Sequence, residues 1–411
     1  MLLYPKQFLK KKSAFSLTRY FPMNFSERRL IFIVSILYLV RMLGLFMVFP
    51  ILGPYAAEIE GSSPVLIGVA LGGYGVTQAI LQIPMSWLSD VFGRKSIIIV
   101  GLVIFCLGSV VAGLASNIST MIIGRLLQGG GAIAGSVMAL IIDNTRESQR
   151  AKSMAIVGAS IGISFSLAMV LGPVVAAFLG ISGVFYLTAS LSILGIILVS
   201  YGIPSQSITT PNHDISAMWN IDTVFRVCKD LKLQSLYFGI FCLHFILTTS
   251  FSFVPHSLQV LFNIPRDAHW YIYLPVVLGS LLGVLFILNV FEKNSRSRES
   301  FIFFILILSL SVLGLLFIKN FFIYACFLLI FFVTFNYFEA TLPALVGSQV
   351  LEKNRGLALG LFSTSQFLGA AFGGLFGGWL FQFDSVVWIF CLIPMIFWLF
   401  FELRLSFVGR D

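Results

Sequence analysis

The ten residues SWLSDVFGRK at positions 86–95 form a short charged segment in an otherwise apolar region. A long apolar run precedes this segment, and another, 97–114, follows it. A connection this short makes the two flanking segments antiparallel neighbours. It also gathers one acid and two bases, Asp90, Arg94 and Lys95, at one end of that pair.

The composition predicts a membrane protein. Hydrophobic residues make up 58% of the 411 residues and charged residues 10%, with a mean hydropathy of +0.98. A soluble protein covers its apolar residues with polar and charged side chains. This chain has too few charged side chains to do so. Repeated apolar runs of about 20 residues indicate membrane-spanning helices, because a helix satisfies its own backbone hydrogen bonds in lipid. The predicted fold class is therefore an all-α membrane protein.

We expect twelve spans, arranged as two six-helix bundles. The predicted spans are 30–55, 64–88, 96–115, 118–142, 152–179, 183–203, 235–260, 268–290, 300–318, 320–346, 355–380 and 384–403. The longest polar interruption divides the chain in two. The predicted domains are a basic amino-terminal tail (1–29), an N-terminal bundle (30–203), a linker (204–234), a C-terminal bundle (235–403) and a carboxy-terminal tail (404–411).

The basic residues predict the orientation in the membrane. Of the 26 Lys and Arg residues, 22 fall in segments on the same side as the amino terminus. Arg266 and Lys319 fall on the other side, and Arg41 and Arg125 lie within spans. Because basic residues collect in cytoplasmic loops, both termini are predicted to be cytoplasmic. The net charge of +9 is thereby explained by topology, and no nucleic-acid partner is expected.

The two halves of the sequence resemble each other at a shift of 205 residues. The pairs that carry weight at this shift are Pro50 with Pro255, Glu147 with Glu352, Arg150 with Arg355, and Gly172 with Gly377. Two parallel-repeat halves around a central path are typical of one class of secondary transporter.

The charged segment resembles the loop signature G-x-x-x-D-x-x-G-R-K of the major facilitator superfamily, at the expected place between the second and third spans. The matching residues are Asp90, Gly93, Arg94 and Lys95. Ser86 stands where the signature begins with Gly. The resemblance covers essentially the whole chain, and it implies a twelve-helix fold of two pseudo-symmetric bundles that transports small molecules by alternating access.

Within the superfamily, the chain resembles the drug–proton antiporter group. The segments that carry this likeness are RMLGLFMVFP at 41–50, GYG at 73–75 and TQA at 77–79. The likeness implies an inner gate of Asp90, Arg94 and Asp143, with Asp90 facing the start of the eleventh span. It also implies the cytoplasmic (inner) membrane of a bacterium as the location.

Polar side chains within lipid are costly, so each needs a partner or a function. Arg41 falls at mid-membrane, where it either faces a functional cavity or bonds to neighbouring backbone. Arg125 and Gln128 resemble the span-four motif R-x-x-Q-G of proton-coupled members, which implies a role in coupling. Gly172 and Pro173 resemble the core of an antiporter motif in span five, although its other glycines are alanine here. Their alternative role is helix packing with a proline kink.

Glu339 is the one acid placed well inside a predicted span, with Asn336 one turn before it. Burial disfavours the ionised form of a carboxylate and a nearby cation opposes this, so Glu339 is a candidate to take up and release a proton. The alternatives are attraction of a cationic substrate and a fixed structural pair. His244 and Gln78 belong to polar stripes at four-residue spacing, which are candidates to line a water-filled path.

The sequence contains no Walker lysine loop, zinc-ligand spacing or nucleophile triad, so neither an enzyme nor a cofactor is predicted. We expect a proton-coupled transporter that exports small amphipathic or hydrophobic compounds. Two alternatives remain open: a proton-coupled importer of a metabolite, and a non-transporting membrane sensor or scaffold. The expected partners are a small-molecule substrate, protons and the lipid bilayer, with the chain acting as a monomer.

Overall fold

The structure is a computed structural model, and it describes residues 23–203, 221–291, 298–350, 355–383 and 386–408. The predicted domain boundaries stay a prediction. Most of the predicted amino-terminal tail, 1–22, and half of the predicted linker, 204–220, lie outside the described residues.

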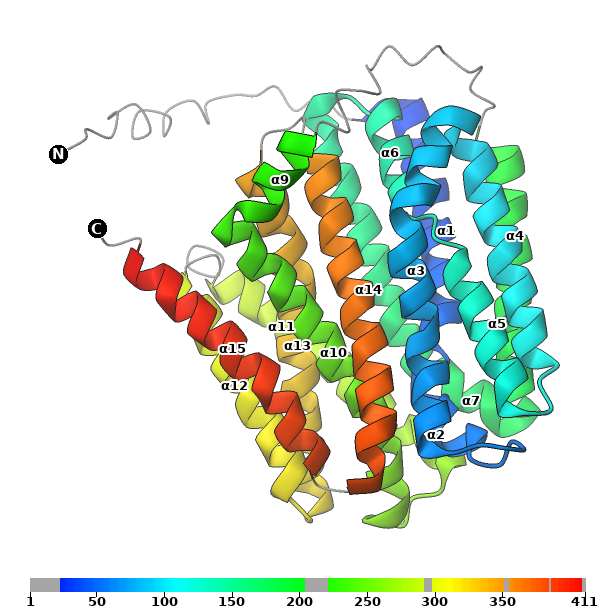
Figure 1. Cartoon of the computed structure of the whole chain (residues 1–411), viewed down its shortest axis with the longest axis vertical. Coiled ribbons are helices and arrows are strands. Elements are labelled where there is room, and N and C mark those ends of the chain that lie inside the picture. The colour runs from blue at the N-terminus through cyan, green and yellow to red at the C-terminus, as the bar shows by residue number, and fades with distance from the viewer. Residues whose placement is uncertain (1–22, 204–220, 292–297, 351–354, 384–385, 409–411) are drawn as a thin grey trace.

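The described chain is almost entirely helical (Figure 1). The N-terminal helices are α1 (Phe25–Phe46), α2 (Phe49–Ala56), α3 (Pro64–Phe92), α4 (Arg94–Gly113), α5 (Ile118–Gly130), α6 (Ala134–Asn144) and α7 (Glu147–Gly202). The C-terminal helices are α9 (Ile221–Lys229), α10 (Leu231–Val260), η3 (Arg266–Ala268), α11 (Trp270–Phe291), α12 (Arg298–Phe317), α13 (Phe321–Gln349), α14 (Arg355–Leu380), η5 (Phe381–Phe383) and α15 (Val386–Val408).

Helix α7 accounts for two membrane crossings. Eleven described helical segments are long and apolar enough to span a bilayer, and α7 is 56 residues long. At about 1.5 Å per residue, that length exceeds twice the bilayer core of about 30 Å. The helix breaks at Gly180, whose φ of 67° and ψ of −177° are open essentially to glycine alone. The predicted fold of twelve crossings is confirmed, with spans five and six joined at the predicted gap.

Helices α1–α7 pack mainly against one another and form the N-terminal bundle, and α10–α15 form the C-terminal bundle. In each bundle the fifth span packs along the first. A Cβ added to Gly172 would lie 2.4 Å from the Met47 carbonyl oxygen, and one added to Gly377 would lie 3.0 Å from Ser252 Oγ. Met47 and Ser252 are themselves 205 residues apart, so the contact obeys the predicted internal repeat.

We name the two ends of the helices by their loops. The Arg94 end, at the top of Figure 1, holds the start of α1 and the α3–α4 junction. The Arg266 end holds the end of α2 and the short helix η3.

The two bundles meet most closely toward the Arg266 end. There α3 and α14 touch backbone to backbone: a Cβ on Gly68 or Gly72 would lie 2.4 Å from a carbonyl oxygen of α14. Toward the Arg94 end, added Cβ atoms would meet open space at four glycines, two on each bundle: Gly158 and Gly162 of α7, and Gly356 and Gly360 of α14. The bundles are therefore in close contact toward the Arg266 end, and no such close glycine contact occurs at these four positions.

Candidate functional site

Arg41 lies in the interior of the N-terminal bundle, where it is 1% exposed. Its guanidinium donates to the Gly131 carbonyl at 2.8 Å and to Gln78 Oε1 at 3.4 Å. Its centre lies 5.6 Å from the centre of the Phe105 ring. Within the part of the chain that the structure describes, none of the ion pairs includes Arg41.

Arg125 is also fully buried in this bundle. Its Nε donates to the Ala70 carbonyl at 3.0 Å, and its guanidinium donates to Gln128 Oε1 at 2.7 Å. Gln128 in turn donates a hydrogen bond to Ser109 Oγ at 2.8 Å. The guanidinium lies 4.7 Å from the centre of the Tyr74 ring. Arg125 and Gln128 therefore bond to each other within a network that ties α3, α4 and α5 together, and their predicted role in coupling stays a prediction.

Span four is not the single helix expected over 118–142, because it is broken at residues 131–133, between α5 and α6. A break leaves backbone carbonyls without helical partners. Arg41 takes one of them, and the Tyr38 hydroxyl donates to the Ala134 carbonyl at 3.3 Å. The glycine run 129–131 marks this place in the sequence, but such a run is typical of close helix packing as well.

In the C-terminal bundle, three helices bring Glu339, His244 and Gln366 together. Gln366 Nε2 donates to Glu339 Oε1 at 3.2 Å and lies 2.8 Å from His244 Nε2. His244 Nδ1 lies 3.3 Å from the Ile240 carbonyl oxygen, so that nitrogen carries the proton and Nε2 accepts from Gln366. His244 Nε2 and Glu339 Oε2 are 3.8 Å apart. The cluster thus holds a carboxylate beside a neutral imidazole.

Two amide side chains belong to this region, and only one of them, Asn336, was among the predicted site residues. Asn336, one turn before Glu339, donates to Ser280 Oγ of α11 at 3.1 Å. It therefore joins α13 to α11 rather than reaching the carboxylate. Gln366 was not among the predicted site residues, because it directly follows the polar run 363–365 and does not stand out in the sequence.

Aromatic rings line the contact between the bundles beside this cluster. Phe165 of α7 lies 5.6 Å from Phe335 and 6.0 Å from Phe332, both of α13, measured between ring centres. The Phe335 ring lies 5.8 Å from the His244 ring. A titratable carboxylate therefore sits next to an aromatic surface that both bundles share.

The loop-signature residues form a compact set at the Arg94 end. Arg94 pairs with Asp90, and its Nε lies 3.1 Å from Asp143 Oδ2. Arg94 also donates to Ser89 Oγ at 2.8 Å. All these partners belong to the N-terminal bundle. The side chain of Arg355, at the start of α14, lies outside the described residues, so the predicted contact of Asp90 with that helix start stays a prediction.

Gly93 and Lys95 have structural positions in the same loop. Gly93 joins α3 to α4 with a φ of 90°, in the region that favours glycine. Lys95 Nζ donates to the carbonyls of Ser200 and Ile203, both at 2.6 Å, so it caps the end of α7. Cations are favourable at helix carboxyl ends.

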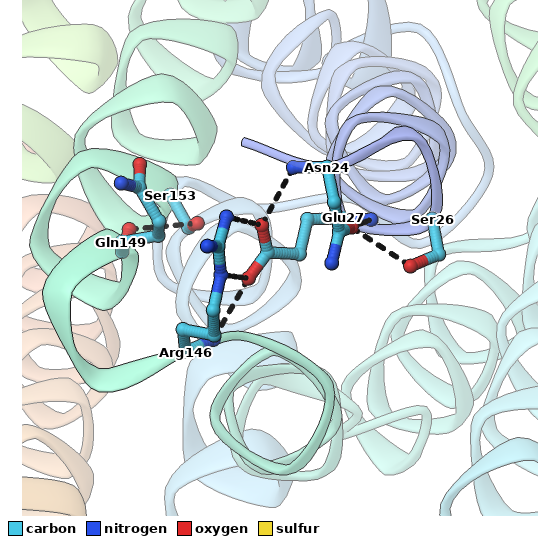
Figure 2. Close-up of polar contacts among 6 residues, drawn as sticks. All are labelled: Asn24, Ser26, Glu27, Arg146, Gln149 and Ser153. Carbon is cyan, nitrogen blue, oxygen red and sulfur yellow. Dashed lines mark hydrogen bonds and ion pairs between the residues drawn. The ribbon is translucent and has the colours of Figure 1, made fainter. Parts of the chain in front are cut away.

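Two buried acids were not among the predicted site residues. Glu27, 2% exposed, pins the start of α1 to the start of α7 (Figure 2). Its carboxylate accepts bonds of 2.8–2.9 Å from the Asn24 backbone N–H and from the backbone and guanidinium of Arg146. The bond to Glu27 raises the pKa of Arg146. Glu402, 4% exposed, is bonded by Ser235 within the C-terminal bundle, so Glu339 is not alone among acids within spans.

Comparison with known proteins agrees with this architecture. The family model of the Major Facilitator Superfamily matches residues 34–348. The chain is 39% identical over 361 residues to the inner membrane transport protein YajR of Escherichia coli K12, covering 88% of this chain and 79% of that protein. It is 28% identical over 362 residues to the quinolone resistance protein NorA of Staphylococcus aureus, covering 83% and 87%.

Solved structures share the fold at low sequence identity. A bacterial homologue of the human lysosomal transporter Spinster, in an inward-facing and unoccupied conformation, superposes with a TM-score of 0.73 at 13% identity, over 92% of this chain and 97% of that one. The nucleoside transporter NupG superposes with a TM-score of 0.70 at 15% identity, over 91% and 98%. Family match, relatives and fold together show that this chain is a multi-pass membrane transporter of the Major Facilitator Superfamily.

Proposed function

We propose that the protein is a proton-coupled antiporter that exports small amphipathic or hydrophobic compounds by alternating access. The observation that carries the proposal is the position of Glu339, a carboxylate within a span whose side chain is 28% exposed. A carboxylate in such a site binds or releases a proton when its exposure to water changes. Movement of one bundle against the other supplies that change.

The surroundings of Glu339 support a shared site for proton and substrate. Gln366 donates to the Glu339 carboxylate, and the His244 Nε2, which accepts from the same amide, lies 3.8 Å from that carboxylate. The aromatic surface around Phe165 and Phe335 suits apolar or ring-containing compounds. The relative NorA is named for quinolone resistance, which supports export as the direction.

We further propose that the Arg94 end faces the cytoplasm, which agrees with the placement of 22 of 26 basic residues on that side. The structure then corresponds to the state closed toward the outside. In the opposite state, the group of Asp90, Arg94 and Asp143 would hold the cytoplasmic side closed through contact of Asp90 with the start of α14.

Proton flux in proteoliposomes tests the proposal. The purified protein is reconstituted around a trapped pH-sensitive dye, a proton gradient is imposed, and a panel including a quinolone and ethidium is added. For the wild type we expect at least one compound to accelerate proton movement across the membrane. In Glu339→Gln, which keeps the shape but never ionises, compound-dependent proton movement is expected to vanish.

Glu402→Gln is the matched control, because Glu402 is another carboxylate within a span of the same bundle, buried and bonded to Ser235. It should retain compound-dependent proton movement if it folds. Unchanged proton coupling in Glu339→Gln, beside a working wild type, would remove Glu339 from the mechanism. A panel with no active compound in any orientation of the gradient would favour a non-transporting role.

A further inference from the structure

Four polar residues join the two bundles at the Arg266 end. Tyr55 and Glu58 lie at and just after the end of α2, in the N-terminal bundle. Arg266 and Asp267 form η3, which precedes α11 of the C-terminal bundle. Although 212 residues separate Tyr55 from Asp267 in sequence, the tyrosine hydroxyl donates to Asp267 Oδ1 at 2.8 Å.

Arg266 makes the other contacts across this boundary. Its guanidinium donates to Glu58 Oε1 at 2.7 Å and to the Pro54 carbonyl at 3.4 Å. It also lies 4.3 Å from the centre of the Tyr55 ring. Arg266 therefore bonds to a carboxylate, a carbonyl and an aromatic face of the opposite bundle at once. Asp267 holds the same tyrosine from the other side.

The position of this group decides what it can do. It lies at the end where α3 and α14 already touch through glycines. When the bundles separate at that end, all three cross-bundle hydrogen bonds must break, because each has one partner on either bundle. The contacts at Arg94 differ, since Arg94, Asp90 and Asp143 all lie in the N-terminal bundle and move together.

We propose that Tyr55, Glu58, Arg266 and Asp267 form a latch that holds the Arg266 end closed and opens once in each transport cycle. The proposal rests on the alternating-access function above, although its test measures conformation without transport. The contacts of the latch contribute little free energy. The side chains of Glu58 and Asp267 are 68% and 62% exposed, and solvent-exposed ion pairs contribute little. A weak latch suits an end that must open repeatedly.

Distances between the bundles test the latch directly. Nitroxide labels are placed at Glu60 and Leu261, two exposed positions at the Arg266 end on opposite bundles, in the full chain with its five cysteines replaced. Pulsed electron paramagnetic resonance in lipid nanodiscs then gives the distance distribution. Arg266→Ala should move population from the short to a longer distance, changing their ratio by about two- to tenfold.

Two further variants separate a latch from general loosening. Arg146→Ala removes an arginine–glutamate pair of similar length, 2.8 Å, whose partners both lie in the N-terminal bundle. It should leave the Glu60–Leu261 distribution unchanged. The exchange of Glu58→Arg with Arg266→Glu restores opposite charges and should recover much of the short population.

The outcomes decide the matter without reference to a substrate. A shift in Arg266→Ala, absence of a shift in Arg146→Ala, and recovery in the charge exchange would together support the latch. An unchanged distribution in Arg266→Ala, confirmed as folded by its size-exclusion profile, would overturn it. Equal shifts in Arg266→Ala and Arg146→Ala would overturn it as well, while leaving proton-coupled transport to be judged by its own assay.

Discussion

At the scale of single residues, the N-terminal bundle keeps two buried cations without acidic partners among the described residues. Arg41 and Arg125 both bond instead to backbone carbonyls and to a glutamine side chain. A carbonyl freed by a helix break costs free energy if it is left unpaired in lipid. Arg41 supplies the missing donor to Gly131, which gives this residue a structural task whatever its part in coupling.

Replacing Arg41 with alanine should therefore destabilise the protein. The substitution leaves a cavity and deprives the Gly131 carbonyl of its donor, which we expect to lower the free energy of unfolding by about 2–5 kcal/mol. Thermal unfolding in detergent measures the change. Arg28→Ala is the control, because Arg28 is an exposed base on the same helix. Equal melting temperatures for the two variants would contradict this role of Arg41.

Site residues whose burial in lipid costs much free energy could be predicted from the sequence. Other residues of the site could not. Arg41, Arg125 and Glu339 are ionisable groups inside apolar runs, and that cost makes them visible. Gln366 directly follows the polar run 363–365, so it does not stand out in the sequence, although it bonds both Glu339 and His244. Glu27 was hidden by the neighbouring bases of the amino-terminal segment, and only the three-dimensional fold brings Arg146 to it.

At the scale of helices, glycine decides how closely the bundles approach. A Cβ on Gly72 of α3 would lie 2.4 Å from the Ala371 carbonyl oxygen of α14, whereas a Cβ on Gly158 of α7 would meet nothing within 4 Å. The two positions thus form a natural pair for experiment. Each is a glycine within a helix, and the surroundings alone differ.

Gly72→Ala should impair transport, because backbone cannot give way as a flexible side chain does. Overpacking at this contact is expected to disfavour the state closed at the Arg266 end by about 1–3 kcal/mol. Gly158→Ala should transport normally and gain slightly in stability, since alanine is the better helix former. Initial rates in proteoliposomes, with a panel compound that the wild type transports, provide the comparison. Equal rates in the two variants would contradict the proposed packing constraint.

The two helix breaks show what a local sequence pattern can and cannot predict. The junction of spans five and six was predicted at 180–182, because the apolar stretch is too long for a single bilayer crossing. In the structure the junction lies at Gly180. The break at 131–133 was not predicted, because a run of glycines is equally suited to close helix packing. Both readings hold there: Gly129 also lies against the Tyr74 carbonyl, 2.1 Å from an added Cβ. Tertiary contacts, which a sequence pattern does not contain, decide between such readings.

At the scale of the whole molecule, the predicted repeat is the feature that the structure explains best. Met47 with Gly172 and Ser252 with Gly377 are equivalent contacts in the two bundles. We expect two such repeated halves to move as rigid bodies, with changes concentrated at the surface between them. The polar latch, the glycine contact of α3 with α14 and the aromatic rings beside Glu339 all lie on that surface.

The central claim is that the two ends open in alternation, and paired distances test it most directly. One label pair, Glu60 with Leu261, reports on the Arg266 end, and a second, Ser148 with Ser348, reports on the Arg94 end from exposed positions. Both are measured in the wild type, in Gly72→Ala and in Gly158→Ala. We predict that Gly72→Ala lengthens the first distance and shortens the second, while Gly158→Ala changes neither. Lengthening at the Arg266 end without shortening at the Arg94 end would contradict alternating access in this protein.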